Sequence, residues 1–198
     1  MMSLLTIGDQ FPAYTVCAVA GGDLSHADAE NPYDHFVIAS SRGRSARWRV
    51  IFFWSRDAMP ESRSQIAAFA NVYDRFVDRD TDILGVSVDN KYAHFYCRTH
   101  LECLQLVPFP LLSDFSHVMA AAAGVLNRDG VADRATFIVD SDNEIRYLAV
   151  SSSPSECSVD GILQLLDDLQ SADLHTGGGR RQSCARLMKG QPSPRSVT

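Results

Sequence analysis

The sequence predicts an α/β fold in which a central mixed sheet is flanked by helices. Two observations lead to this class. Apolar, β-favouring runs alternate with segments of helical periodicity, and the last two such runs stand on either side of a four-residue turn. The alternation indicates strands joined through helices, and the turn indicates a hairpin at the end of the sheet. The length of 198 residues suits one domain with an additional arm.

The first predicted strand, residues 48–54, is a continuous β-favouring run, apolar or aromatic at every position except Arg49, as in a strand buried on both faces. Ile66, Phe69, Tyr73 and Phe76 follow at helical spacing and predict an amphipathic helix.

The remaining elements follow in the same order. Residues 83–88 predict a second buried strand, and residues 92–104 predict a helix that stops before a Pro-Phe-Pro run. A short helix is expected over residues 116–123, ending at Gly124. The hairpin and the closing helix are predicted at residues 135–139, 144–150 and 161–169.

Charge divides the chain into two parts. Residues 175–198 hold five basic residues and no acidic one, whereas the rest of the chain has a net charge of −11. We therefore predict a domain over residues 1–173 and a basic, Gly/Ser/Pro-rich arm over residues 174–198, of a kind that is often mobile. An acidic body argues against nucleic acid as the main ligand.

The composition also bears on the compartment. No apolar stretch approaches the roughly 18–20 residues of a membrane span, and the first residues lack the pattern of a secretory signal. The five cysteines are scattered and form no Cys-x-x-Cys pair, which is typical of reduced thiols. We expect a cytoplasmic protein without a membrane partner.

Five strings, in this order, resemble the peroxiredoxins of the alkyl hydroperoxide reductase C and thiol-specific antioxidant (AhpC/TSA) class, above all actinobacterial two-cysteine members. The resemblance covers about residues 3–172 and implies a thioredoxin-like fold that assembles as a homodimer or a ring of dimers. The strings are residues 7–12 (Ile-Gly-Asp-Gln-Phe-Pro), 50–54 (Val-Ile-Phe-Phe-Trp), 84–89 (Leu-Gly-Val-Ser-Val-Asp), 109–114 (Phe-Pro-Leu-Leu-Ser-Asp) and 134–140 (Arg-Ala-Thr-Phe-Ile-Val-Asp).

The same resemblance places the family's peroxide site on residues that cannot perform its chemistry. The family motif Pro-x-x-x-Thr-x-x-Cys falls on Ser55, Met59 and Ser62, and only Arg134 matches the family's distal arginine. A serine hydroxyl is not appreciably ionised near neutral pH and has no sulfur to oxidise. The resolving cysteine of the family is expected near residues 175 and 176, which are His and Thr. The sequence therefore predicts that the peroxiredoxin cycle is lost.

The replaced residues suggest a different use of the site. We expect Ser62 and Arg134 to be catalytic, as hydrogen-bond donor and electrophilic stabiliser, beside free N–H groups at a helix N-terminus. Ser55, Met59, Arg63 and Ser64 are expected to contact a small oxygenated or anionic substrate, with no cofactor and no metal. As simple structural roles, Ser62 or Ser64 could cap the helix, with Gln65 completing a capping box around Ser62.

Three functions stay open at this point: a thiol-independent, cofactor-free enzyme, a non-catalytic oligomeric scaffold or holdase, and residual peroxidase activity through another cysteine such as Cys184. The residues His94, Cys97, His100 and Cys103 follow at three-residue spacing on one predicted helix. Such a row turns by about 60° at each step, so its four side chains cannot converge on one ion, and a structural role is expected for them.

Overall fold

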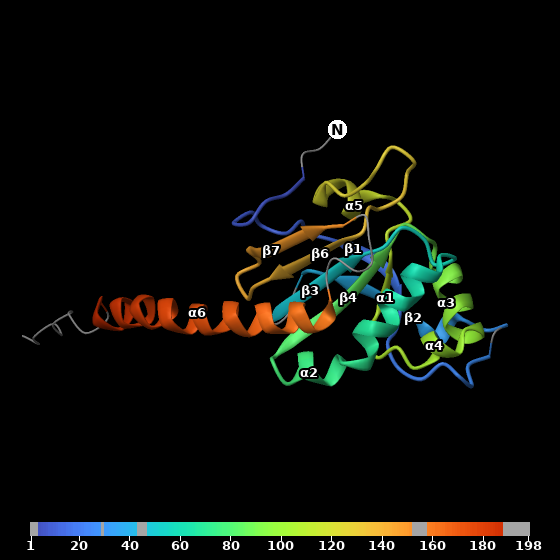
Figure 1. The fold of residues 1–198 in the computed structure, drawn as a ribbon, viewed down its shortest axis with the longest axis horizontal. Helices are drawn as coiled ribbons and strands as arrows, with labels where there is room; N and C mark the ends of the chain where they lie inside the picture. The colour runs from blue at the N-terminus through green and yellow to red at the C-terminus, as the bar shows by residue number, and fades with distance from the viewer. Residues whose placement is uncertain (1–3, 29, 43–46, 152–157, 188–198) are drawn as a thin grey trace, which may run out of the picture.

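The computed structural model describes residues 4–28, 30–42, 47–151 and 158–187. They form one seven-stranded sheet in the order β2-β1-β5-β4-β3-β6-β7 (Figure 1). The strands are β1 (Thr15–Val19), β2 (Phe36–Ser40), β3 (Trp48–Phe53), β4 (Thr81–Ser87), β5 (Leu111–Ser113), β6 (Ala135–Val139) and β7 (Ile145–Val150). The helices are η1 (Tyr33–His35, a 3₁₀ turn), α1 (Pro60–Asn71), α2 (Tyr73–Val77), α3 (Lys91–His100), α4 (Glu102–Gln105), α5 (Val118–Ala123) and α6 (Val159–Leu187).

The sheet is mixed, as predicted. Strands β3, β4 and β5 run parallel, whereas β6 pairs antiparallel with β3 and β7 antiparallel with β6. On the other side β1 pairs antiparallel with both β5 and β2. The thioredoxin-like α/β class expected from the sequence is therefore confirmed.

Alternate residues of β3 feed two apolar cores on opposite faces of the sheet. Ile51 and Phe53 pack in the core that includes α5, and Val50 and Phe52 pack in the core under the helices α1, α2 and α6. All four of these side chains are fully buried, which explains why the run shows no polar alternation. This arrangement places the start of α1 one short loop after the end of β3, an interior strand of the sheet.

Three strands were missing from the sequence prediction. β1 and β2 pair with each other at one end of the sheet, and the exposed Val37 and Ile38 of β2 break the expected polar alternation. β5 has only three residues, too few to show a period. The prediction therefore lacks the three strands at one side of the seven-stranded sheet.

Two predicted helices are each divided in the structure. Val72, with φ −123° and ψ 18°, separates α1 from α2, and Leu101, with φ −111° and ψ 110°, separates α3 from α4. Both are apolar residues whose side chains satisfy a helical pattern although their backbones leave the helix. Apolar spacing reports which side of a segment is buried and does not report such a break.

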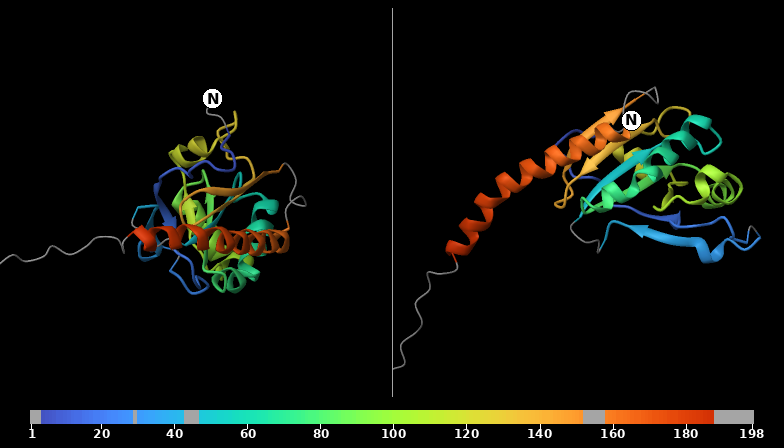
Figure 2. Two further views of the ribbon diagram at one scale, coloured as in Figure 1. Left: turned by 90° about the vertical axis from the view of Figure 1, so that its left-hand side faces the viewer. Right: turned by 60° about the horizontal axis from the view of Figure 1, so that its bottom comes forward.

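Helix α6 continues to Leu187, well past the predicted end at residue 169, and projects beyond the sheet (Figures 1 and 2). The expected arm therefore begins as helix. Residues 159–187 contain three consecutive glycines, each of which lowers helix propensity by about 1 kcal/mol, but no proline that would end the helix. The division into a domain and an arm at residue 174 stays a prediction. No helix among the described residues is long and apolar enough to cross a membrane.

Candidate functional site

The candidate site begins where β3 ends and α1 begins. Met59 is the N-cap residue of α1, with an extended backbone, and Pro60 occupies the first helical position, which its fixed φ favours. Ser62 is therefore the third residue of the helix. The expected capping roles of Ser62, Ser64 and Gln65 are wrong, because the helix starts before them and its N-cap makes no side-chain hydrogen bond.

The backbone of this first turn is largely occupied. The amides of Ser62 and Arg63 both donate to the carbonyl oxygen of Met59, at 3.1 and 3.2 Å. Ser64 Oγ donates to the carbonyl of Pro60 at 3.0 Å. The helix N-terminus consequently offers fewer free donors to a ligand than the sequence suggested, so side chains must provide most of the recognition.

A buried polar cluster, which we call the Asp57 cluster, fixes the loop before α1. Asp57 Oδ2 lies 2.6 Å from His94 Nδ1, and Asp57 Oδ1 accepts from Trp54 Nε1 at 2.9 Å. The Asp57 amide donates to Asp89 Oδ2 at 2.8 Å. The other ring nitrogen of His94 lies 3.2 Å from the carbonyl oxygen of Leu112.

The two partners of the His94 ring explain its charge. A carboxylate and a carbonyl oxygen both accept hydrogen bonds, so both ring nitrogens donate when the imidazole is protonated. Burial of His94 acts to lower its pKa, but the charge and hydrogen bond of Asp57, together with Asp89 and the Leu112 carbonyl, raise the pKa above its ordinary value. The raised pKa favours the protonated ring, and in that state Asp57 and His94 form a buried ion pair that holds the loop.

Arg63 takes part in the same arrangement. Its Nε donates to the carbonyl oxygen of Asp57 at 3.0 Å, so its guanidinium fastens the loop onto α1. Cys97, on α3, also lies near these charges, and burial raises the pKa of its thiol to about 11. This thiol is almost entirely protonated at neutral pH and is a poor nucleophile there.

Three buried polar atoms have no hydrogen-bond partner within the described part of the chain: Ser62 Oγ, Gln65 Oε1 and Arg134 Nε. Two belong to α1 and the third to the residue that precedes β6. An unsatisfied buried polar group costs about 1–3 kcal/mol, so groups of this kind mark a place where a ligand can be accommodated. Ser62 as a whole is fully buried, whereas Gln65 and Arg134 are half-buried.

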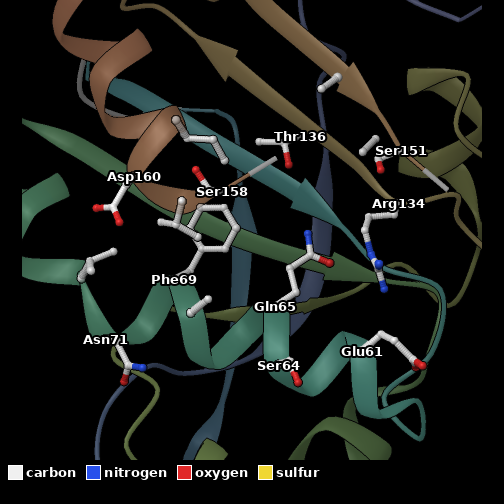
Figure 3. A pocket seen from close by; sticks show the side chains of 16 residues that line it. Glu61, Ser64, Gln65, Phe69, Asn71, Arg134, Thr136, Ser151, Ser158 and Asp160 are labelled. Atoms are coloured by element: carbon white, nitrogen blue, oxygen red, sulfur yellow. The ribbon is translucent and has the colours of Figure 1, made fainter. Parts of the chain in front are cut away.

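Arg134 lies between two cavities. The larger, of about 450 Å³, is bounded by α1, β6, β7 and the start of α6 (Figure 3). The smaller, of about 430 Å³, lies toward the loop before α1 and is lined by Ser55, Met59, Glu61, Asn127, Ala132, Asp133, Arg134 and Ser151. Glu61, Arg134 and Ser151 line both cavities. In Figure 3 the side chains of Gln65 and Arg134 enter the larger cavity from α1 and from the sheet.

The structure brings together part of the predicted site. Ser55, Met59 and Arg134 share the smaller cavity, and Ser64 and Arg134 share the larger one. Ser62 is among the lining residues of neither and lies beneath the surface, because its position in the first turn faces the core. Arg63 is likewise outside both linings, since it is bonded to the loop carbonyl.

Several residues at the site were missed by sequence reasoning. Glu61 was overlooked, although as the residue after Pro60 it stands in the first turn with its carboxylate exposed. For Gln65 the sequence predicts only a capping role. The pairing of Asp57 with His94 joins residues that are 37 positions apart, and no local pattern predicts it.

The row of histidines and cysteines is divided between two helices, because His94, Cys97 and His100 lie on α3 and Cys103 lies on α4. His94 is committed to Asp57, and the His100 ring stacks on Tyr96 at 4.0 Å between centroids. Cys97 is buried and Cys103 is exposed. Within the described residues, no group of three or more His, Cys, Asp or Glu side chains is placed to hold a metal ion.

Comparisons with known proteins identify the family. Residues 7–148 match the model of the AhpC/TSA family. The chain belongs to this family. It is 50% identical over 173 residues to the protein named alkyl hydroperoxide reductase C of Mycolicibacterium smegmatis. The aligned region covers 87% of this chain and 89% of that protein.

Solved structures of family members agree with the fold. Mycobacterium tuberculosis AhpC superposes with a TM-score of 0.79 at 50% identity, covering 86% of this chain and 96% of that one. A reduced two-cysteine peroxiredoxin of Plasmodium vivax gives a TM-score of 0.73 at 26% identity, covering 85% and 99%. The peroxiredoxin fold of this AhpC/TSA member is thus established, while its own chemistry depends on its residues.

Proposed function

We propose that this AhpC/TSA family member has lost thiol peroxidase chemistry and acts as a cofactor-independent enzyme on a small oxygenated or anionic molecule bound at Arg134. The observation that carries the proposal is a pair of unpartnered atoms in residues that line the larger cavity, Gln65 Oε1 on α1 and Arg134 Nε just before β6. Ser62 Oγ, buried in the first turn of α1, is also unpartnered but reaches neither cavity. The resemblance to the family aligns its peroxidatic cysteine with residue 62, which is a serine in this chain.

The available thiols support the loss of peroxidase chemistry. The sequence holds no cysteine between residues 17 and 97. Cys97 lies on α3, and its pKa of about 11 leaves only on the order of one molecule in ten thousand as thiolate at pH 7. The attack on a peroxide needs the thiolate, so the loop and first turn of α1 offer no group for it.

The residues that line the cavities support an alternative reaction. Arg134 can bind a carboxylate or enolate oxygen, and Glu61 lines both cavities beside it. In such a reaction Glu61 takes a proton from the carbon next to a carbonyl, and the electron pair moves onto the enolate oxygen held by Arg134. Return of a proton to the same carbon gives hydrogen exchange, and return to another carbon gives a rearrangement. Neither reaction needs a cofactor.

Deuterium exchange tests this reaction. The purified chain is mixed in D₂O with a panel of small 2-oxo acids, and loss of the proton next to the carbonyl is followed by NMR. We expect the wild-type chain to accelerate exchange, Arg134→Ala to abolish the acceleration and Ser62→Ala to reduce it. A variant with all five cysteines replaced by serine should match the wild type.

A matched control is the exposed Arg128, which lines neither cavity. Arg128→Gln removes the same charge and should leave exchange unchanged. Equal rates in Arg134→Ala and in the wild type would remove this site from the mechanism. Loss of exchange in the cysteine-free variant would instead support a thiol reaction.

We also infer that the chain assembles as a homodimer or a ring of dimers. Support comes from the edge strand β2, where Ile38 is 66% exposed and Val37 41%, since exposed apolar edges favour pairing with another chain. Sedimentation velocity of the full chain should show a dimer or larger species. A single monomeric species over a wide concentration range would contradict this inference.

A further inference from the structure

We propose that the larger cavity is a binding site for a small carboxylic acid with an apolar tail, whose carboxylate is held by Arg134 and whose tail lies between α1 and α6. The inference rests on the proposed function, because both place the anion at Arg134. It goes further in naming the class of ligand and the cavity that selects it. Figure 3 shows the side chains on which the argument depends.

The charge at the cavity indicates a single negative charge on the ligand. Among the described residues that line the larger cavity, Arg134 is the only cation, and its Nε has no partner. Two carboxylates, Glu61 and Asp160, line the same space. Asp160 is paired with Arg75 at 2.6 Å, and Glu61 is exposed. A monoanion can be neutralised by the Arg134 guanidinium alone, whereas a phosphate dianion would need a second cation, and the described lining residues supply none.

The floor of the cavity indicates an apolar tail. Phe69 and Ile162 line it and are almost fully buried, and Val72 lies beside them. The Phe69 ring stacks on Phe52 at 4.2 Å between centroids, which fixes the orientation of this surface. The smaller cavity, by contrast, is lined by Asp133 and Asn127 and offers little apolar area. A tail that extends from Arg134 is therefore better accommodated in the larger cavity.

The polar rim and the volume limit the size of the ligand. Ser64, Asn71, Thr136 and Ser158 surround the apolar floor and can exclude a longer chain or bond a second oxygen. A volume of about 450 Å³ corresponds to roughly fifteen water molecules, which suits a ligand of about ten to fifteen heavy atoms. An aromatic ring on a short linker, or an alkyl chain of similar size, fills this space.

Protection of Arg134 from phenylglyoxal, a reagent for exposed guanidinium groups, tests the proposal on the full chain. The modified arginines are located by peptide mass spectrometry in the presence of phenylpropanoate, its neutral amide or acetate. Arg128, which is exposed and lines neither cavity, serves as an internal control in every sample. The readout is the concentration of each compound that halves modification at each arginine.

We expect phenylpropanoate to protect Arg134 at concentrations at least about tenfold lower than acetate, and the amide to protect it poorly. A tenfold gain corresponds to about 1.4 kcal/mol, which burial of roughly 55 Å² of apolar surface provides. Modification of Arg128 should be unaffected. Replacement of Ala68, on the α1 wall, by phenylalanine should raise the phenylpropanoate requirement to that of acetate.

Ala149→Leu fills the same cavity from the opposite wall, on β7. It serves as the second test variant, with the same expected result, if the Ala68→Phe protein does not fold. Phenylpropanoate that protects no better than acetate would overturn the apolar site while leaving an anion site at Arg134, and with it the proposed function. Failure of both acids to protect Arg134 would overturn both. Equal protection of Arg128 would show that the effect is not specific to the cavity.

Discussion

Truncation of Asp57 tests whether the Asp57 cluster holds the loop before α1. In Asp57→Ala, the His94 imidazolium loses its carboxylate and Trp54 Nε1 loses its acceptor. Both members of the pair are buried: His94 has no exposed surface and Asp57 is 4% exposed. Removal of one partner of a buried ion pair costs about 3–5 kcal/mol. For a chain of this length, the melting temperature should fall by about 6–20 °C.

The measurement is urea unfolding followed by the fluorescence of the two tryptophans, Trp48 and Trp54. Asp57→Asn is the matched variant, because it keeps an oxygen acceptor for Trp54 and removes only the charge. It should lose less stability than Asp57→Ala. A free energy of unfolding for Asp57→Ala within 1 kcal/mol of the wild type, a margin well below the expected loss for a buried pair, would refute the role of the cluster.

The same pair predicts a dependence on pH. Since folding raises the pKa of His94, the folded chain binds this proton more tightly than the unfolded chain. The resulting stabilisation is fully present below the unfolded pKa of about 6.5 and is lost as the pH rises through the folded value. In His94→Gln, which cannot titrate, this fall in the free energy of unfolding should be absent. Parallel pH profiles for the two proteins would contradict the assignment.

Three further variants or measurements test other parts of the structure. A Cβ at Gly85 would lie 2.8 Å from the Trp54 ring, so Gly85→Ala should lower the free energy of unfolding by about 1–3 kcal/mol in urea titrations; an unchanged midpoint would contradict the packing. Arg98 is fully buried and donates to backbone carbonyls, including that of Val107 at 2.9 Å, so Arg98→Met should cost about 3 kcal/mol by thermal unfolding. A melting temperature within a degree of the wild type would show that these bonds are dispensable. Iodoacetamide at about pH 7.5 should label the exposed Cys103 and leave the buried Cys97 unmodified; mass spectrometry that finds both labelled equally would contradict their burial.

The sequence predicts the parts of the fold in which burial follows a local pattern. The run at β3 and the hairpin of β6 and β7 were found because their apolar residues and turn are contiguous. Strand β5 was missed because three residues show no period, and β1 and β2 because their pairing joins segments about twenty residues apart. The breaks at Val72 and Leu101 depend on packing between helices, which no single segment reveals.

In the candidate site, too, some residues can be predicted from the sequence and others depend on the three-dimensional structure. Arg134 could be chosen from the sequence because the resemblance fixes its position beside β6, and the structure places it between two cavities. The inward position of Ser62 depends on where α1 begins, and Pro60 rather than a serine sets that start. Which side chains of α1 face the cavities, Glu61 and Gln65 among them, depends on the residue at which the helix begins, and the sequence pattern does not fix that residue.

The rate of hydrogen peroxide consumption tests the central claim most directly. The full chain is assayed with a thioredoxin-type reductant beside its cysteine-free variant and beside a two-cysteine member of the family. Our account predicts that the wild-type chain and the cysteine-free variant consume peroxide at the same background rate, far below that of the relative. Consumption at the rate of the relative, abolished in the cysteine-free variant, would contradict it.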